Sequence, residues 1–162
     1  MADAHQYLLE NFDKYDFIWS SPPCPSHSIM RLLAVYTKQN KPVYPDMRLY
    51  EEILFLQQYF KGKYCVENVR SWYQPLIRPQ VLNRHYYWTN FIIKRKTDKH
   101  SELIWNSNNL DRMKLKKIDI SQFKNIDKKK VLNNMVNGDD GLLILNCAIN
   151  EPQKRLATLL QQ

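Results

Sequence analysis

The chain has 162 residues and a formal net charge of +8; 44% of its residues are apolar and 12% are aromatic. This length fits one domain with a real core, and the composition argues against disorder. No apolar run is long enough to cross a membrane, and the first residues lack the basic start and apolar centre of a signal peptide. We therefore expect a cytoplasmic protein.

Cysteine and glycine limit the chemistry that the chain can carry. The three cysteines, Cys24, Cys65 and Cys147, are too few and too far apart in the sequence for a disulfide framework or a zinc site. We expect reduced thiols and no bound metal. With only three glycines, the sequence contains neither a Gly-x-Gly-x-x-Gly loop nor a P-loop. Any nucleotide-like cofactor must therefore be held by other means.

Helical and extended patterns alternate from the first residues onward. Apolar spacing predicts a helix over residues 4–12 and then a strand over residues 15–19. Residues 30–36 are predicted to be helical, and the proline-containing stretch 40–45 is predicted to be a loop.

The clearest periodicity follows that loop. Asp46 is predicted to cap a helix with a regular apolar stripe, and Gly62 is predicted to end the helix as its C′ glycine. Residues 63–69 form a predicted buried strand. After a loop over residues 71–79, the aromatic and β-branched residues 85–93 predict a third strand. Because strands and helices alternate, we expect an α/β protein with a mainly parallel sheet.

Most of the positive charge lies in one segment. Residues 94–130 contain twelve Lys or Arg against five Asp or Glu, which accounts for +7 of the net charge of +8. Such a segment indicates a nucleic-acid partner, although a solvated lysine-rich surface gives the same count. Periodicity fades over residues 95–130, which predicts an extended, weakly structured contact surface. Residues 142–160 are apolar enough for one or two closing helices, interrupted near Pro152.

A cysteine set between prolines follows the first predicted strand. Pro22 and Pro23 precede Cys24 and Pro25 follows it, so the loop is stiff and the direction of the thiol is largely set. Loops at the carboxyl ends of strands are where open α/β sheets place their chemistry. Cys24 is therefore a candidate nucleophile, although a lone cysteine is more often a small buried residue. Glu67 lies similarly near the end of the second strand, where it is either a site residue or a solvated or helix-capping acid.

Four short motifs, in order, resemble those of the cytosine-5 DNA methyltransferase family. Residues 22–28, Pro-Pro-Cys-Pro-Ser-His-Ser, are similar to the nucleophile loop, and residues 67–69 match the Glu-Asn-Val motif. Residues 79–84 resemble the Gln-x-Arg-x-Arg motif, with Leu82 in place of the first arginine. Residues 134–136, Asn-Met-Val, resemble the Asn-x-Val of the last motif. The resemblance covers nearly the whole chain.

The resemblance implies a role for each motif. Cys24 would attack C6 of cytosine, Glu67 would donate to N3, and Arg84 would bind O2 and help to neutralise the developing charge. The target base would be flipped out of the duplex, and the basic segment would hold phosphates and read the target sequence. The residues implied to contact the substrate are Pro22, Pro23, Ser26, Ser28, Asn68, Val69 and Gln80, and those implied to contact S-adenosylmethionine are Asp3, Pro22, Asn134 and Val136.

The resemblance also implies a division of the chain. Residues 1–93 would form a partial Rossmann-like methyltransferase sheet, residues 94–130 a short target-recognition segment, and residues 131–162 a last motif and helices that pack back on the catalytic part. The sequence lacks the Phe-x-Gly-x-Gly loop with which the family binds S-adenosylmethionine.

We therefore expect the catalytic subunit of a split enzyme that acts on double-stranded DNA in the bacterial nucleoid or a phage-infected cell. A partner chain with the glycine loop would bind most of the S-adenosylmethionine, so the active form would be a hetero-oligomer. Two alternatives remain: a non-enzymatic DNA-binding or regulatory protein derived from a methyltransferase, and a truncated product without activity of its own.

Overall fold

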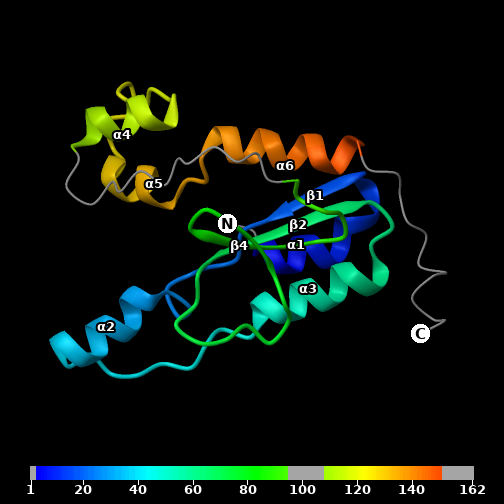
Figure 1. Ribbon diagram of the computed structural model, residues 1–162, viewed down its shortest axis with the longest axis horizontal. Coiled ribbons are helices and arrows are strands. Elements are labelled where there is room, and N and C mark those ends of the chain that lie inside the picture. The colour runs from blue at the N-terminus through cyan, green and yellow to red at the C-terminus, as the bar shows by residue number, and fades with distance from the viewer. Residues whose placement is uncertain (1–2, 95–107, 151–162) are drawn as a thin grey trace.

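The computed structural model describes residues 3–94 and 108–150, in which a four-stranded sheet carries helices on both faces (Figure 1). The strands are β1 (Phe17–Ser20), β2 (Lys63–Val69), β3 (Gln80–Leu82) and β4 (His85–Thr89). The helices are α1 (Ala4–Asn11), the short 3-10 helix η1 (Phe12–Lys14), α2 (Ile29–Lys38), α3 (Arg48–Tyr59), α4 (Asn109–Lys116), α5 (Lys128–Asn134) and α6 (Gly138–Asn150).

The sheet is mixed, with the strand order β1-β2-β4-β3. β1 runs parallel to β2, whereas β4 runs antiparallel to both β2 and β3. The α/β class is confirmed, but the prediction of a mainly parallel sheet is wrong. β3 and β4 are joined by a two-residue turn with Asn83 at a φ of 52°, and a connection this short can only reverse the chain. The third predicted strand is also shorter than expected, because β4 ends at Thr89.

One face of the sheet packs on α3. The predicted apolar stripe of that helix is confirmed, since Leu49, Ile53 and Leu56 are at most 2% exposed. α1 joins this layer through Phe12, just beyond its last residue, whose ring meets Phe55 edge-on at 4.9 Å between ring centres. The sheet residues in this cluster are Ile18, Tyr64, Val66 and Trp88.

The other face of the sheet packs on α6, which lies across the opposite side from α3 (Figure 1). Ile144, Cys147 and Ala148 of this helix are buried against Cys65 and Tyr87 of the sheet, among others. One predicted closing helix is thus present, beginning four residues early at Gly138. Residues 151–162 lie outside the described residues. No helix in the described part of the chain is long and apolar enough to cross a membrane.

The basic segment is more regular than predicted. α4 and the start of α5 fall within its described part, and the side chains of Asn108 and Asp127 cap the two helices. Arg112 is only 5% exposed, because α4 and α5 pack on one another. The prediction of an extended surface is therefore wrong for residues 109–116 and 128–130, which are helical, whereas residues 117–127 between them have no regular secondary structure. Residues 95–107 lie outside the described residues.

α2 projects away from the sheet, directly after the Cys24 loop (Figure 1). The helix predicted over residues 30–36 is present and extends from Ile29 to Lys38. None of its residues is buried, and Tyr36 is 77% exposed. An amphipathic helix without a packing partner in the described residues is an available contact surface.

The helix that Asp46 is predicted to cap begins at Arg48, one residue later than that cap position implies. Met47 occupies the N-cap position, but the Asp46 carboxylate accepts a hydrogen bond of 3.1 Å from the backbone N–H of Arg48. Asp46 therefore still satisfies one of the free N–H groups at the helix start.

Gly62 does not end α3 as predicted. The helix ends at Tyr59, and Gly62 has no left-handed backbone conformation. A Cβ at Gly62 would lie 2.4 Å from the backbone oxygen of Asp16, which accepts the hydrogen bond from Lys63 at the start of β2. Gly62 is thus needed where β2 approaches the chain that leads into β1.

We predict that Gly62→Ala destabilises the fold by about 1–3 kcal/mol, because the new methyl group must displace backbone atoms of Asp16. Urea unfolding measures this free energy. Gly141→Ala is the control, since a Cβ there meets nothing within 4 Å and alanine favours a helix by roughly 0.5–1 kcal/mol. Equal stabilities for the two variants would contradict the predicted close approach.

Candidate active site

The loop after β1 and the end of β2 lie side by side. Because β1 and β2 are parallel, with Ser20 opposite Val66, both strands end at the same edge of the sheet. The side-chain amide of Asn68 donates a hydrogen bond of 3.0 Å to the backbone oxygen of Pro22. The structure thus brings together the two segments that carry the nucleophile and Glu-Asn-Val motifs.

Cys24 lies in a compact turn at this edge. Its backbone oxygen accepts hydrogen bonds from the N–H groups of His27 and Ser28, at 3.0 and 3.1 Å. Cys24 is half-buried, whereas the other two cysteines are buried. Burial raises the pKa of the Cys24 thiol, and the negative charge of Glu67 raises it further. Cys24 is therefore the accessible thiol, and it is a better nucleophile when Glu67 is neutral.

Glu67 is a buried acid, only 7% exposed. It lies opposite Tyr87 on the sheet face that α6 covers. Burial raises the pKa of the Glu67 carboxyl, and the hydrogen bond from the Ser21 side chain lowers it in part. A carboxyl group in this environment keeps its proton to a higher pH than an exposed one, so it can act as a hydrogen-bond donor.

Arg84 occupies the exposed turn between β3 and β4. The preceding Asn83 is held by its side-chain amide, which donates hydrogen bonds of 2.9 and 2.8 Å to the two carboxylate oxygens of Asp140 at the start of α6. Burial lowers the pKa of His85, whose ring lies beside Glu67, and the positive charges of Lys116 and Arg84 lower it further. The structure therefore places Arg84 at the rim of the site.

Three residues implied to contact the substrate make internal hydrogen bonds. Ser26 accepts from the backbone N–H of Asp46, and Ser28 caps α2. The Gln80 amide donates to the Thr89 hydroxyl and bonds two backbone groups beyond the end of β4. These side chains shape the loops and the strand end around the site.

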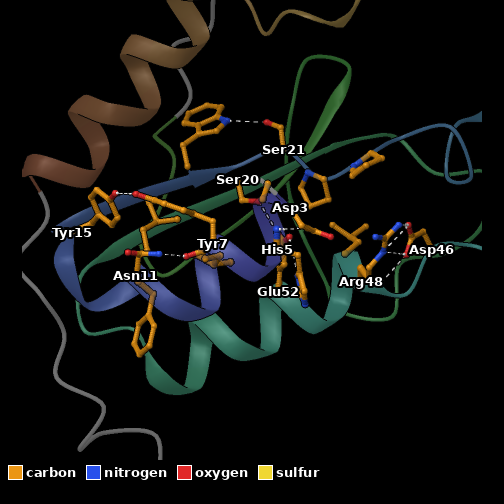
Figure 2. Close-up of a pocket in the computed structure, with 18 of the residues that line it drawn as sticks. Asp3, His5, Tyr7, Asn11, Tyr15, Ser20, Ser21, Asp46, Arg48 and Glu52 are labelled. Carbon is orange, nitrogen blue, oxygen red and sulfur yellow. Dashed lines mark hydrogen bonds and ion pairs between the residues drawn. The ribbon is translucent and has the colours of Figure 1, made fainter. Parts of the chain in front are cut away.

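A pocket of about 530 Å³ opens beside β1 (Figure 2). It is bounded by α1, by all four residues of β1 and by the start of α3. Asp3 and Pro22, both implied to contact S-adenosylmethionine, line it, whereas Asn134 and Val136 do not. Asp3 also caps α1, accepting a hydrogen bond of 2.9 Å from the N–H of His5.

Polar side chains in the pocket wall hydrogen-bond one another (Figure 2). The Ser20 hydroxyl donates to one carboxylate oxygen of Glu52 at 2.5 Å, and His5 Nδ1 lies 3.2 Å from the other. Glu52 is 7% exposed, although the sequence pattern places it outside the apolar stripe of its helix. It is buried because α1 and the end of β1 cover that side of α3, which local periodicity does not reveal.

His27 is a second residue that sequence analysis missed. It is 1% exposed, and its Nδ1 lies 2.6 Å from the Tyr73 hydroxyl. Its Nε2 has no hydrogen-bond partner among the described residues, and His27 lines the pocket. Burial lowers the pKa of His27, so the ring is neutral at neutral pH. An unpartnered buried ring nitrogen beside a pocket is available to a ligand.

Comparison with known proteins adds no relative. No protein-family model, curated protein or solved structure matches the chain. Within residues 3–94 and 108–150, no cluster of His, Cys, Asp or Glu is suited to hold a metal ion. The assignment of function therefore depends on the geometry of the site and on the motif resemblance.

We predict that iodoacetamide alkylates Cys24 before the two buried thiols. At pH 8, Glu67→Gln should speed this reaction by about two- to tenfold, because removing the negative charge lowers the pKa of the Cys24 thiol. Peptide mass spectrometry measures the rate at each cysteine. Glu52→Gln, a change at a similarly buried acid on α3, should leave the rate unchanged. Preferential labelling of Cys65 or Cys147 would contradict this site.

Proposed function

We propose that this chain is the catalytic subunit of a split DNA (cytosine-5-)-methyltransferase. It would supply the nucleophile Cys24 and contacts to double-stranded DNA, while a partner chain supplies most of the S-adenosylmethionine site. The observation that carries the proposal is the placement of Cys24 and Glu67 at one edge of the sheet, close enough for the charge of the acid to act on the thiol.

The environments of the two groups suit addition to cytosine. The Cys24 thiolate forms a bond to C6 of the flipped base, and electron density moves onto the ring. Protonated Glu67 donates its proton to N3 as that density arrives, which its burial favours. While Glu67 is neutral, it does not oppose ionisation of Cys24. Arg84 at the rim would bind O2.

When bound, S-adenosylmethionine would supply the methyl group that C5 receives. The C5 proton is then lost to a base, the proton on N3 returns to Glu67, the C6–sulfur bond breaks, and Cys24 leaves as a thiolate. Methyl transfer therefore restores the enzyme thiol without consuming it.

The open edge of β1 supports a partner chain. β1 is a terminal strand of the sheet, and within the described residues no other strand pairs with its outer edge. All four of its residues line the pocket. A strand from a partner placed there would extend the sheet into a larger Rossmann-like fold and cover an exposed edge. Its glycine loop would then lie near the Cys24 loop if the added strand ran parallel to β1.

The pocket suits the nucleoside end of S-adenosylmethionine. Its lining includes aromatic residues on which an adenine can stack, among them Tyr7 and Tyr15. Asp3, Glu52 and His27 Nε2, which has no partner among the described residues, offer polar contacts to a base or a ribose. Because the glycine loop would come from the partner chain, this chain alone would hold the cofactor only weakly.

The basic helices support a DNA partner. Lys114 on α4, Lys117 just beyond that helix, and Lys129 and Lys130 on α5 are exposed. These helices pack on one another and present lysines that can neutralise phosphates. The same surface also favours the second candidate function, a DNA-binding protein without catalysis, in which Cys24 and Glu67 would have no role.

We predict that Cys24→Ser abolishes methyl transfer by the chain reconstituted with its glycine-loop partner. Glu67→Gln should reduce transfer by roughly 100-fold or more, because the donor to N3 is lost. Transfer of a tritiated methyl group to cytosine-containing duplex DNA measures both effects. Glu10→Gln on the exposed face of α1 is the control and should retain activity.

Duplex binding distinguishes the two candidate functions. In the split enzyme, Glu67→Gln should leave duplex affinity within a few-fold of the unchanged chain, since the lost contact is to the flipped base. The non-enzymatic protein would instead bind DNA in a salt-dependent way, with an affinity that Cys24→Ala does not change. No reconstituted mixture would then transfer methyl groups.

A further inference from the structure

Two side chains of β4 lie next to Glu67 of β2. In the antiparallel register, Tyr87 lies opposite Glu67 and His85 lies opposite Val69, so His85 and Tyr87 share the sheet face of Glu67. His85 Nε2 is 3.6 Å from Glu67 Oε1. The side chain of His85 is 23% exposed and that of Glu67 is 9% exposed. The histidine therefore lies between the buried acid and solvent.

The other groups around this pair do not replace His85. The Tyr87 hydroxyl is buried and has no hydrogen-bond partner among the described residues, so it does not hydrogen-bond Glu67 in the resting site. The Ser21 side chain hydrogen-bonds Glu67 but carries no charge. The charge of Glu67 acts on Cys24, Cys65 and Tyr87. The charged groups that act on His85 are Lys116, Arg84 and Asp140.

We propose that His85 is a positioning residue that compensates the charge of Glu67 during the reaction. When Glu67 gives its proton to N3 of the base, His85 takes up a proton from solvent, and an imidazolium–carboxylate pair forms. When the proton returns from N3 to Glu67, His85 releases its own proton to solvent. The functional meaning of this exchange rests on the proposed methyl transfer, whereas the coupling of the two side chains does not.

The resting electrostatics suit this exchange. Burial lowers the pKa of His85, and the positive charges of Lys116 and Arg84 lower it further, while burial raises the pKa of Glu67. These shifts favour the neutral form of each side chain in the resting site. Once Glu67 is ionised, its negative charge favours the protonated form of His85 at ion-pair distance. Two groups this close titrate as a pair.

Carboxyl carbon NMR of the full chain, with labelled glutamate, tests the coupling directly. In the unchanged protein, the Glu67 signal should titrate in two steps, one of which reports His85. In His85→Gln, which can still hydrogen-bond but cannot be charged, we expect one step, with its midpoint at higher pH. His5→Gln is the matched control, because it makes the same change in the pair formed with Glu52 and should leave Glu67 unaffected.

The reciprocal variant gives an independent reading if His85→Gln fails to fold. In Glu67→Gln, the midpoint of the His85 ring-nitrogen signal should move to lower pH, since the carboxylate that favours imidazolium is gone. A Glu67 titration that is the same in the unchanged protein and in folded His85→Gln would overturn the proposal, as would an unmoved His85 midpoint in Glu67→Gln. Neither titration needs DNA or cofactor.

Catalysis adds a separate reading on the reconstituted enzyme. His85→Gln should lower kcat without changing KM for DNA, and the pH profile of kcat should lose the limb that His85 contributes. An unchanged pH profile would overturn the role in the reaction. If no mixture transfers methyl groups at all, the proposed function fails, and the NMR titrations still decide whether the pair is coupled.

Discussion

The parallel pairing of β1 with β2 is the constraint on which the site depends. It brings the ends of two strands, far apart in the sequence, to one edge, where Asn68 ties the Pro22 backbone to the end of β2. A shift in this pairing by one residue would turn Glu67 toward α3 and away from the α6 face. α3 and α6 hold the sheet from opposite sides, so the position of the acid relative to Cys24 is set by the whole core.

Burial then gives this edge its chemical character. Cys24 and Glu67 are both partly desolvated, which disfavours the charged form of each. The negative charge of Glu67 also opposes formation of the Cys24 thiolate, so the thiol ionises more readily when Glu67 is neutral. A reaction in which Glu67 begins protonated removes that conflict. The carboxylate formed later must be compensated, and His85 is the titratable group placed to do so at 3.6 Å. The mechanism thus follows from how protons are shared among a few buried groups.

Local patterns predicted the elements better than their arrangement. The strand over residues 63–69 and the stripe of α3 agree with the structure, because both depend on periodicity within one element. β3, the antiparallel strand pairs and the burial of Glu52 were missed, since each is decided by which elements meet. The motifs pointed to Cys24 and Glu67 but not to His27 or His85. His27 matters because its Nε2 has no partner among the described residues, and His85 because it lies beside Glu67 on the neighbouring strand.

The composition of the native species tests the central claim most directly. The complex should be purified from its own source and analysed by native mass spectrometry, followed by a methyl-transfer assay. The split-enzyme account predicts a heterodimer with a subunit that carries a Phe-x-Gly-x-Gly loop and transfers methyl groups to cytosine in DNA. A lone monomer or a homodimer without methyl transfer would contradict it.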